Sequence, residues 1–230
     1  MHKINWGIIG CGDVTEIKSG PAFNKVNNSA LVAVMRRDAA KAADYARRHE
    51  VPKWYDDANL LINDPEVNAI YIATPPSSHE SYTLAAIEAG KPVYVEKPMA
   101  MNQATALSMV EAAARKNIKL SVAHYRRAWP MFKQVKQWLD EKLIGDPLFV
   151  RLDYHKLELT PDELQTTRIS WRIDPAIAGG GLFNDFAPHQ LDLMYHFLAR
   201  LKKFRALRSI SLIDMLQMIW SQVIFFSNRG

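Results

Sequence analysis

A glycine-rich segment follows the first apolar run of the chain and has the composition of a phosphate-binding turn. It reads Gly-Cys-Gly-Asp-Val-Thr and fits the G-x-G-x-x-G/A fingerprint except at Thr15. Gly10 allows a tight turn, and Gly12 lets the backbone approach a pyrophosphate, which would bind the N–H groups of Asp13 and Val14 at the next helix start. The pattern predicts a dinucleotide site, and the alternative is a mere tight turn.

Two arginines follow the second apolar run, where a NAD-binding protein usually has an acid for the adenosine ribose hydroxyls. The chain reads Arg36–Arg37–Asp38 at this place. The guanidinium of Arg36 can pair bidentately with a 2′-phosphate, so we expect NADP, with NAD as the alternative cofactor. In the other interpretation both arginines are solvated residues at the start of a helix and Asp38 is its cap.

Two further segments follow later apolar runs and carry polar residues able to contact a ligand. Thr74, Pro75 and His79 belong to Ala-Thr-Pro-Pro-Ser-Ser-His, and Glu96 and Lys97 belong to Glu-Lys-Pro. In open α/β sheets, ligands bind at the carboxyl ends of the strands, where these segments are predicted to lie.

A fourth segment places Asp185 and His189 four residues apart, after three consecutive glycines. This spacing puts both side chains on one face of a helix. Taken alone, such a pair is more often a surface pair or a histidine that caps a core.

Alternating strands and helices must position these segments. Uniformly apolar runs predict buried strands at 3–9, 31–35, 69–73, 93–96 and 120–123. Helical patterns lie between them at 39–49, 78–89 and 103–116. We therefore predict an α/β fold whose N-terminal domain, residues 1–122, is an NAD(P)-binding Rossmann domain with a doubly wound parallel sheet.

The rhythm changes after this domain. Residues 130–145 read as an amphipathic helix closed by glycine, and 148–154 alternate like a strand with one solvated face. Residues 156–179 read as a long loop, and Gly179–Gly180–Gly181 open another helical pattern. Residues 123–230 are therefore predicted to form a partial α+β substrate domain, used also for oligomerisation, with an antiparallel sheet.

These segments together resemble the glucose-fructose oxidoreductase, inositol dehydrogenase and MocA (Gfo/Idh/MocA) family. The Gly-Gly-Leu-Phe-Asn-Asp-Phe-Ala-Pro-His stretch at 180–189 matches that family's G-G-x-x-x-D-x-x-x-H, and the resemblance covers residues 1 to about 198. It implies a cofactor domain followed by a substrate domain, and homo-oligomers among full-length relatives. It also implies a cofactor site formed by Gly10, Gly12, Asp13, Val14, Arg36, Arg37, Thr74, Pro75, His79, Glu96 and Lys97.

The resemblance implies that Lys97, Asp185 and His189 are the catalytic residues. Beside an oxidised nicotinamide, like charge disfavours the Lys97 ammonium, so this side chain can donate or carry a proton. His189 suits removal of the hydroxyl proton as hydride leaves the adjacent carbon. Asp185 would orient His189 or bind a second sugar hydroxyl.

The same family places Trp171 and Arg172 against the nicotinamide and the substrate, although both are equally good at anchoring a loop. Tyr125 and Arg126 begin the second domain and either line its cleft or form a solvated hinge. His155 and His196 have no spaced partners that would form a metal site with His189, so we predict no metal site.

The composition is that of a globular protein. The chain has 230 residues, 48% of them hydrophobic and 23% charged, which excludes disorder. The single cysteine, Cys11, excludes an intramolecular disulfide and favours a reducing compartment. The N-terminus lacks the cleavage site of a signal peptide, so a cytoplasmic protein is expected.

The net charge of +5 is confined to the end of the chain. Residues 199–230 hold six basic residues and one acidic residue, whereas the first 198 residues hold 23 of each. Since a nucleic-acid-binding domain spreads its basic residues over a surface, we predict no nucleic-acid partner. The apolar stretch at 209–226 contains Asp214, two glutamines and three serines, so we predict no membrane span.

Residues 199–230 depart from the family pattern, and we expect them to be translated out of frame. Joining the last nucleotide of each codon to the first two of the next allows Tyr-Ala-x-Asp-Asp-Met-Val-Ser-Gly across 214–223. This stretch resembles one that follows the D-x-x-x-H helix in the family. The chain would then be truncated or frameshifted after about residue 198, and the alternative is a real, divergent tail.

The leading hypothesis is an NAD(P)-dependent oxidoreductase that exchanges hydride with a hydroxyl or carbonyl carbon of a sugar, polyol or related small molecule. The alternatives are a non-catalytic sensor or regulator of the same fold and an inactive truncated product. Because Lys97, Asp185 and His189 are all present, an enzyme is favoured.

Overall fold

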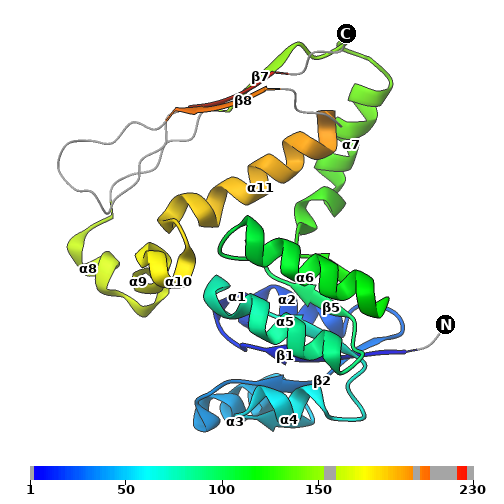
Figure 1. Ribbon diagram of the computed structural model, residues 1–230, viewed down its shortest axis with the longest axis vertical. Coiled ribbons are helices and arrows are strands. Elements are labelled where there is room, and N and C mark those ends of the chain that lie inside the picture. Colours follow the sequence, from blue (N-terminus) through cyan, green and yellow to red (C-terminus); the bar gives the residue numbers. More distant parts are fainter. Residues whose placement is uncertain (1–2, 153–158, 199–202, 208–221, 227–230) are drawn as a thin grey trace. The chain divides into compact units, whose positions relative to one another are not determined.

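The computed structural model describes residues 3–152, 159–198, 203–207 and 222–226 (Figure 1). The chain divides into two compact units, Met1–Ala123 and His124–Gly230. Each unit has its own sheet and its own apolar core.

The described residues of the first unit form a six-stranded parallel sheet with helices on both faces (Figure 1). The strand order is β3-β2-β1-β4-β5-β6, the order of a dinucleotide-binding Rossmann fold, so the predicted α/β fold class is confirmed. The strands are β1 (Ile4–Ile9), β2 (Ser29–Met35), β3 (Lys53–Tyr55), β4 (Ala69–Ile72), β5 (Val93–Val95) and β6 (Leu120–Val122). The helices are α1 (Asp13–Ile17), α2 (Ser19–Phe23), α3 (Ala39–Arg48), α4 (Ala58–Ile62), η1 (Pro76–Ser78), α5 (His79–Glu88) and α6 (Gln103–Lys116).

The strands of this sheet are apolar throughout because both faces are covered. Ile9 and Ile72 belong to a core cluster shared with α4, α5 and α6, whereas Ile8 and Tyr71 belong to a second cluster shared with α2 and α3. All four side chains are fully buried. Adjacent residues of one strand thus pack on opposite faces of the sheet. Because a shift by one residue would exchange these faces, the register of each strand, and with it the position of the strand end, is fixed.

The sequence patterns do not predict strand β3 or helix α4, and they do not reveal that the helix after the glycine turn is divided. Strand β3 has three residues and lies at the sheet edge, with Trp54 exposed, so it lacks the apolar run by which the other strands are recognised. Helix α4 has five residues, too few for helical periodicity to be read. The helix expected after the glycine turn is divided into α1 and α2 at Lys18.

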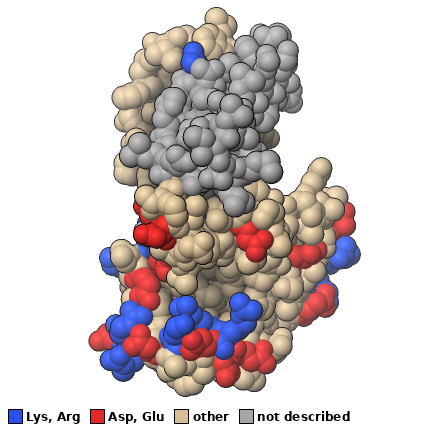
Figure 2. All heavy atoms as spheres, turned by 90° about the vertical axis from the view of Figure 1, so that its left-hand side faces the viewer, with Lys and Arg blue, Asp and Glu red and all other residues tan. Residues whose placement is uncertain are grey.

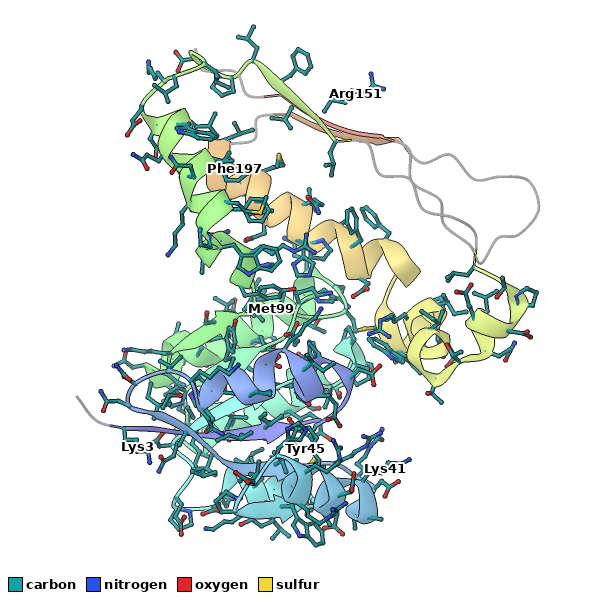
Figure 3. All side chains as sticks on the ribbon, turned by 180° about the vertical axis from the view of Figure 1, so that it is seen from behind. Lys3, Lys41, Tyr45, Met99, Arg151 and Phe197 are labelled. Carbon is teal, nitrogen blue, oxygen red and sulfur yellow. The ribbon has the colours of Figure 1, made fainter. Side chains whose placement is uncertain are left out.

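The second unit combines helices with an antiparallel sheet of order β7-β9-β8. Strand β7 alternates as predicted: Phe149 and Arg151 are exposed, while Val150 and Leu152 pack with the cluster around Leu193. Figure 3 shows Phe197 beside α7, where its ring lies 6.1 Å from that of Phe132. The elements are η2 (Tyr125–Ala128), α7 (Pro130–Asp140), β7 (Phe149–Leu152), α8 (Pro161–Gln165), α9 (Thr167–Ile173), α10 (Pro175–Ala178), α11 (Gly181–Leu198), β8 (Lys203–Leu207) and β9 (Gln222–Phe226).

The expectation of a long loop over 156–179 is wrong. The described part of this segment forms α8, α9 and α10, with capping signals that the hydrophobic pattern does not reveal. Thr160 and Glu163 form a capping box before α8, and Asp174 accepts a hydrogen bond from the backbone of Ala176 at the start of α10. The helix predicted to reach residue 145 ends at Asp140.

The tail predicted to be out of frame lies largely outside the described residues. Within 199–230, only the backbones of β8 and β9 are described. The reading-frame hypothesis therefore stays a prediction about the gene.

Candidate active site

The segments singled out in the first unit follow strands β1, β2, β4 and β5, which are parallel, so they meet at one edge of the sheet. Backbone hydrogen bonds continue past the strands: Gly10 N–H donates to Met35 O and Ala73 N–H to Ile9 O, both at 2.9 Å. The strand order reverses between β1 and β4, so the glycine turn and Thr74 flank the position where open α/β sheets bind ligands.

The two glycines of the turn are required for different reasons. Gly10 has φ +93°, and a Cβ there would lie 2.7 Å from Thr74 Cγ2 and 2.9 Å from Thr74 N. Gly12 has an extended backbone, φ −128° and ψ −158°, and a Cβ there would meet no described atom within 4 Å. The fold itself therefore requires Gly10, whereas Gly12 leaves open the space where a pyrophosphate would approach Asp13 and Val14 at the start of α1.

Arg36 lies against this turn. Its side chain is half-buried and donates a hydrogen bond from Nη1 to Cys11 O at 3.2 Å, while Arg37 beside it is exposed. Asp38 caps α3 by accepting from Lys41 N at 3.1 Å, and this bond lowers the pKa of Asp38. The interpretation of Asp38 as a cap is thus confirmed, but Arg36 is not a solvated residue of the helix start.

His79 joins the loop after β4 to the loop after β5. It is fully buried, with Nε2 2.7 Å from Thr74 O and Nδ1 3.0 Å from Pro98 O. Burial lowers its pKa. Its ring thus faces backbone carbonyls, and its part at this edge of the sheet is to position Thr74 and the segment that contains Lys97.

Glu96 and Lys97 follow β5 directly. Glu96 is 8% exposed, accepts a hydrogen bond from the Tyr71 hydroxyl at 2.6 Å and accepts another from Lys97 N at 3.2 Å. Burial, and then the charge of Glu96, raise the pKa of Tyr71, so this phenol stays protonated. The Lys97 side chain is partly exposed at the carboxyl edge of the sheet.

In the second unit, α11 carries Asp185 and His189. The Nε atom of Arg172 on α9 lies 3.8 Å from a carboxylate oxygen of Asp185, and the Arg172 guanidinium covers the ring of Trp171 at 4.4 Å. His189 is 6% exposed, and the Tyr125 ring meets it edge to face at 5.6 Å. The structure thus groups Trp171 and Arg172 with Asp185, and Tyr125 with His189.

Sequence reasoning missed an ion pair next to this group. Arg127 donates from Nε to Asp192 Oδ2 at 2.7 Å and from Nη2 to Oδ1, which raises the Arg127 pKa. His124 Nδ1 lies 3.7 Å from the same carboxylate. Asp192 follows His189 by three residues on α11, so that spacing was the available signal. The pair holds η2, and with it Tyr125, against α11.

Arg126, which precedes this pair, is half-buried. Its Nε atom is buried and has no hydrogen-bond partner among the described residues, and its guanidinium lies 6.0 Å from the ring of Trp129. A buried donor of this kind can bond a hydroxyl or carboxylate of a ligand.

Within the described ranges, no three His, Cys, Asp or Glu side chains are grouped to hold a metal ion. No helix in the part of the chain that the structure describes is both long and apolar enough to cross a membrane. On the face shown in Figure 2, Lys and Arg side chains of the first unit lie among Asp and Glu rather than in a broad surface of one charge.

Comparison with known proteins gives two family matches. Residues 4–124 match the family described as "Oxidoreductase family, NAD-binding Rossmann fold", and residues 132–214 match the GFO/IDH/MocA C-terminal domain. The second match extends into the tail beyond residue 198.

Individual proteins agree with this result. Oxidoreductase P35 of Formosa agariphila is 49% identical over 203 residues, which are 88% of this chain and 63% of the relative. The 1,5-anhydro-D-fructose reductase of Ensifer adhaerens is 32% identical over 189 residues, 82% of this chain and 55% of that protein. Levoglucosan dehydrogenase in complex with NADH and levoglucosan is structurally similar, with a TM-score of 0.80, 27% identity, and coverage of 91% of this chain and 57% of that one. The chain thus spans little more than half the length of these relatives.

A Rossmann sheet with a glycine turn at its switch point, followed by a helix that carries the Asp185 and His189 pair, agrees with both family matches. The chain belongs to the Gfo/Idh/MocA oxidoreductase family.

Proposed function

We propose that the protein is an NAD(P)-dependent oxidoreductase that acts on a carbon bearing a hydroxyl or carbonyl group in a sugar or polyol. The observation that carries this proposal is the open space at Gly12, beside the strand-order reversal. Neither packing nor the backbone conformation accounts for a glycine there, but the close approach of a pyrophosphate does. When bound, the nicotinamide would accept or supply the hydride.

In the oxidation direction, the alcohol loses a hydride from carbon and a proton from oxygen, which leaves a carbonyl. We assign the proton to His189, whose ring is held by Tyr125 in a buried site. Asp185, oriented by Arg172, would bind a neighbouring hydroxyl. The family resemblance also assigns Lys97, at the end of β5, a role as proton donor or carrier beside the nicotinamide.

A sugar or polyol substrate is supported by two observations. Relatives of this chain are named for 1,5-anhydro-D-fructose and for levoglucosan, both polyhydroxylated rings. In this chain the buried Nε of Arg126 and the Arg172–Asp185 pair offer donors and acceptors suited to hydroxyl groups.

For the cofactor, we propose a preference for NADP. In the sequence, Arg36 falls where a NAD-binding protein usually has an acid for the ribose hydroxyls. Asp38, two residues further on, is engaged as a helix cap. A guanidinium at that place would pair with the 2′-phosphate. The buried, free thiol of Cys11 agrees with a protein of the cytoplasm.

The experiment uses the 230-residue chain and has two stages. Tryptophan fluorescence is titrated with NADPH and NADH, and oxidised cofactor is then mixed with a panel of sugars and polyols while the reduced-nicotinamide absorbance is followed. We expect binding in the first stage and an absorbance increase with at least one sugar in the second. A sugar-dependent fluorescence change without any absorbance change would favour a sensor, and absence of dinucleotide binding would overturn the proposal.

A further inference from the structure

We propose that Tyr45 and Gly20 together replace the third glycine of the phosphate-binding fingerprint, so that Tyr45 is a positioning residue for pyrophosphate binding. This inference rests on the proposed cofactor site and names residues outside the glycine turn. In the usual fingerprint, the third glycine lets the first helix approach the strand closely. Here Thr15 occupies that position.

Thr15 is tied to the turn that it follows. Its side chain is fully buried and donates from Oγ1 to Gly12 O at 2.7 Å, and its backbone N–H donates to the same oxygen at 2.9 Å. Any force that moves Thr15 therefore moves Gly12 and the start of α1. The position of the turn therefore also depends on the residues outside the turn that contact Thr15.

Tyr45 supplies that contact from α3. Its hydroxyl donates to Thr15 O at 2.8 Å, and its ring is 1% exposed within the core cluster that contains Cys11 and Ile8. Figure 3 shows Tyr45 inside the first unit, on the side of α3 that meets the sheet. The packed ring fixes the position of the hydroxyl. The hydrogen bond from this hydroxyl therefore fixes the position of the Thr15 carbonyl.

Gly20 makes room for this bond. A Cβ at Gly20 would lie 2.3 Å from both Thr15 O and the Tyr45 hydroxyl, so no other residue fits without displacing one of them. The break between α1 and α2 at Lys18 brings Gly20 to this place. The glycine that permits close packing is therefore Gly20, five positions after Thr15, which occupies the usual place of the third glycine.

A second contact links the same two helices at the surface. Arg48 of α3 donates two hydrogen bonds to Glu16 of α1, at 2.7 and 2.8 Å, and His49 Nε2 lies 2.7 Å from the same carboxylate. Consecutive residues of α1 are therefore held by one face of α3. These surface contacts help Tyr45 to hold α1 against α3, but they do not contact the backbone of the glycine turn.

The decisive variant is Tyr45→Phe, which keeps the ring and removes only the hydroxyl. Its matched control is Tyr55→Phe, which removes the hydroxyl bond to Asp64 at 2.9 Å in the same unit and leaves the glycine turn unaltered. Each variant is titrated with the dinucleotide that the parent chain binds best. Each is also titrated with a fragment that lacks the pyrophosphate: adenosine 2′-monophosphate for NADPH, or adenosine for NADH.

We expect Tyr45→Phe to bind the dinucleotide about fivefold more weakly, the effect of one intramolecular hydrogen bond, and to bind the fragment as the parent does. Tyr55→Phe should bind both ligands like the parent. Gly20→Ala, a second test of the same bond, should weaken dinucleotide binding at least as much as Tyr45→Phe. Unchanged dinucleotide affinity in Tyr45→Phe, or an equal loss for dinucleotide and fragment, would overturn the inference. A parent chain that binds no dinucleotide would instead overturn the proposed function.

Discussion

Alanine at each glycine of the turn should separate stability from cofactor binding. In Gly12→Ala the backbone is extended, and the new methyl group meets no described atom within 4 Å. The free energy of unfolding should stay equal or rise by about 0.5 kcal/mol, because alanine restricts the unfolded chain. The same methyl group enters the space assigned to the pyrophosphate. A misfit of this size costs about 1–3 kcal/mol, which is a loss of about fivefold to 150-fold in dinucleotide affinity.

Gly10→Ala should behave in the opposite way. The residue has φ +93°, which costs an L-residue about 1–2 kcal/mol. The methyl group would also lie 2.7 Å from Thr74 Cγ2 and 2.9 Å from Thr74 N, and the second contact is with backbone that cannot rotate away. Adding about 1–3 kcal/mol for this overlap, we expect the free energy of unfolding to fall by about 2–5 kcal/mol.

The assay is urea unfolding of both variants and the parent, followed by titration of each folded protein with NADPH and NADH. Gly10→Ala serves as the control for a substitution that weakens cofactor binding by destabilising the fold. If Gly12→Ala binds both dinucleotides like the parent, the space beside Gly12 is not a pyrophosphate site. If Gly12→Ala is as unstable as Gly10→Ala, the assignment of different causes to the two glycines is wrong.

Four further outcomes are expected. Lys97→Ala should abolish hydride transfer in stopped-flow reduction of the cofactor while cofactor affinity stays within about tenfold, and unchanged turnover would remove Lys97 from the mechanism. NADP should bind more tightly than NAD, more so at low salt, and Arg36→Ser should remove about a tenfold preference; a parent chain that prefers NAD would contradict this role. The Arg48 bond lowers the Glu16 pKa from 4.5 to about 2, so Glu16 contributes stability above about pH 4.5 that is lost as the pH falls towards 2. The free energy of unfolding of Glu16→Gln, measured at a series of pH values, should be about 1 kcal/mol below that of the parent at neutral pH and closer to it at acid pH. A difference that does not change with pH would refute the contribution of the ion pair. Resequencing the gene across residues 199–230 should reveal a shifted frame, whereas an uninterrupted frame without a family-like shifted reading would exclude it.

Most of the first unit could be predicted because its signals are local. Strands covered on both faces are apolar at every position, as at 69–72, so they stand out from the helices between them. The glycine turn and the Lys97 segment were placed at strand ends by position along the chain alone. Parallel strands with one order then bring those ends to the same edge, which needs no side-chain detail.

Short elements were missed for the same physical reason. Helices α8, α9 and α10 have four to seven residues, and α8 and α10 begin with side-chain caps from Thr160 and Asp174. One or two turns give no hydrophobic periodicity, so only these caps marked α8 and α10 in the sequence. The long loop predicted there followed from reading periodicity without caps.

The sequence by itself determined which residues are candidates for the chemistry, whereas the tertiary structure decided which contacts hold those residues in place. Tyr45 and Thr15 are 30 residues apart, and Arg127 and Asp192 are 65 apart, yet each pair shares a hydrogen bond. Such contacts exist only after helices pack on a sheet or on one another, so no pattern among neighbouring residues encodes them. Gly12 shows both contributions: the residue type is given by the sequence, but the open space beside it is a property of the folded turn.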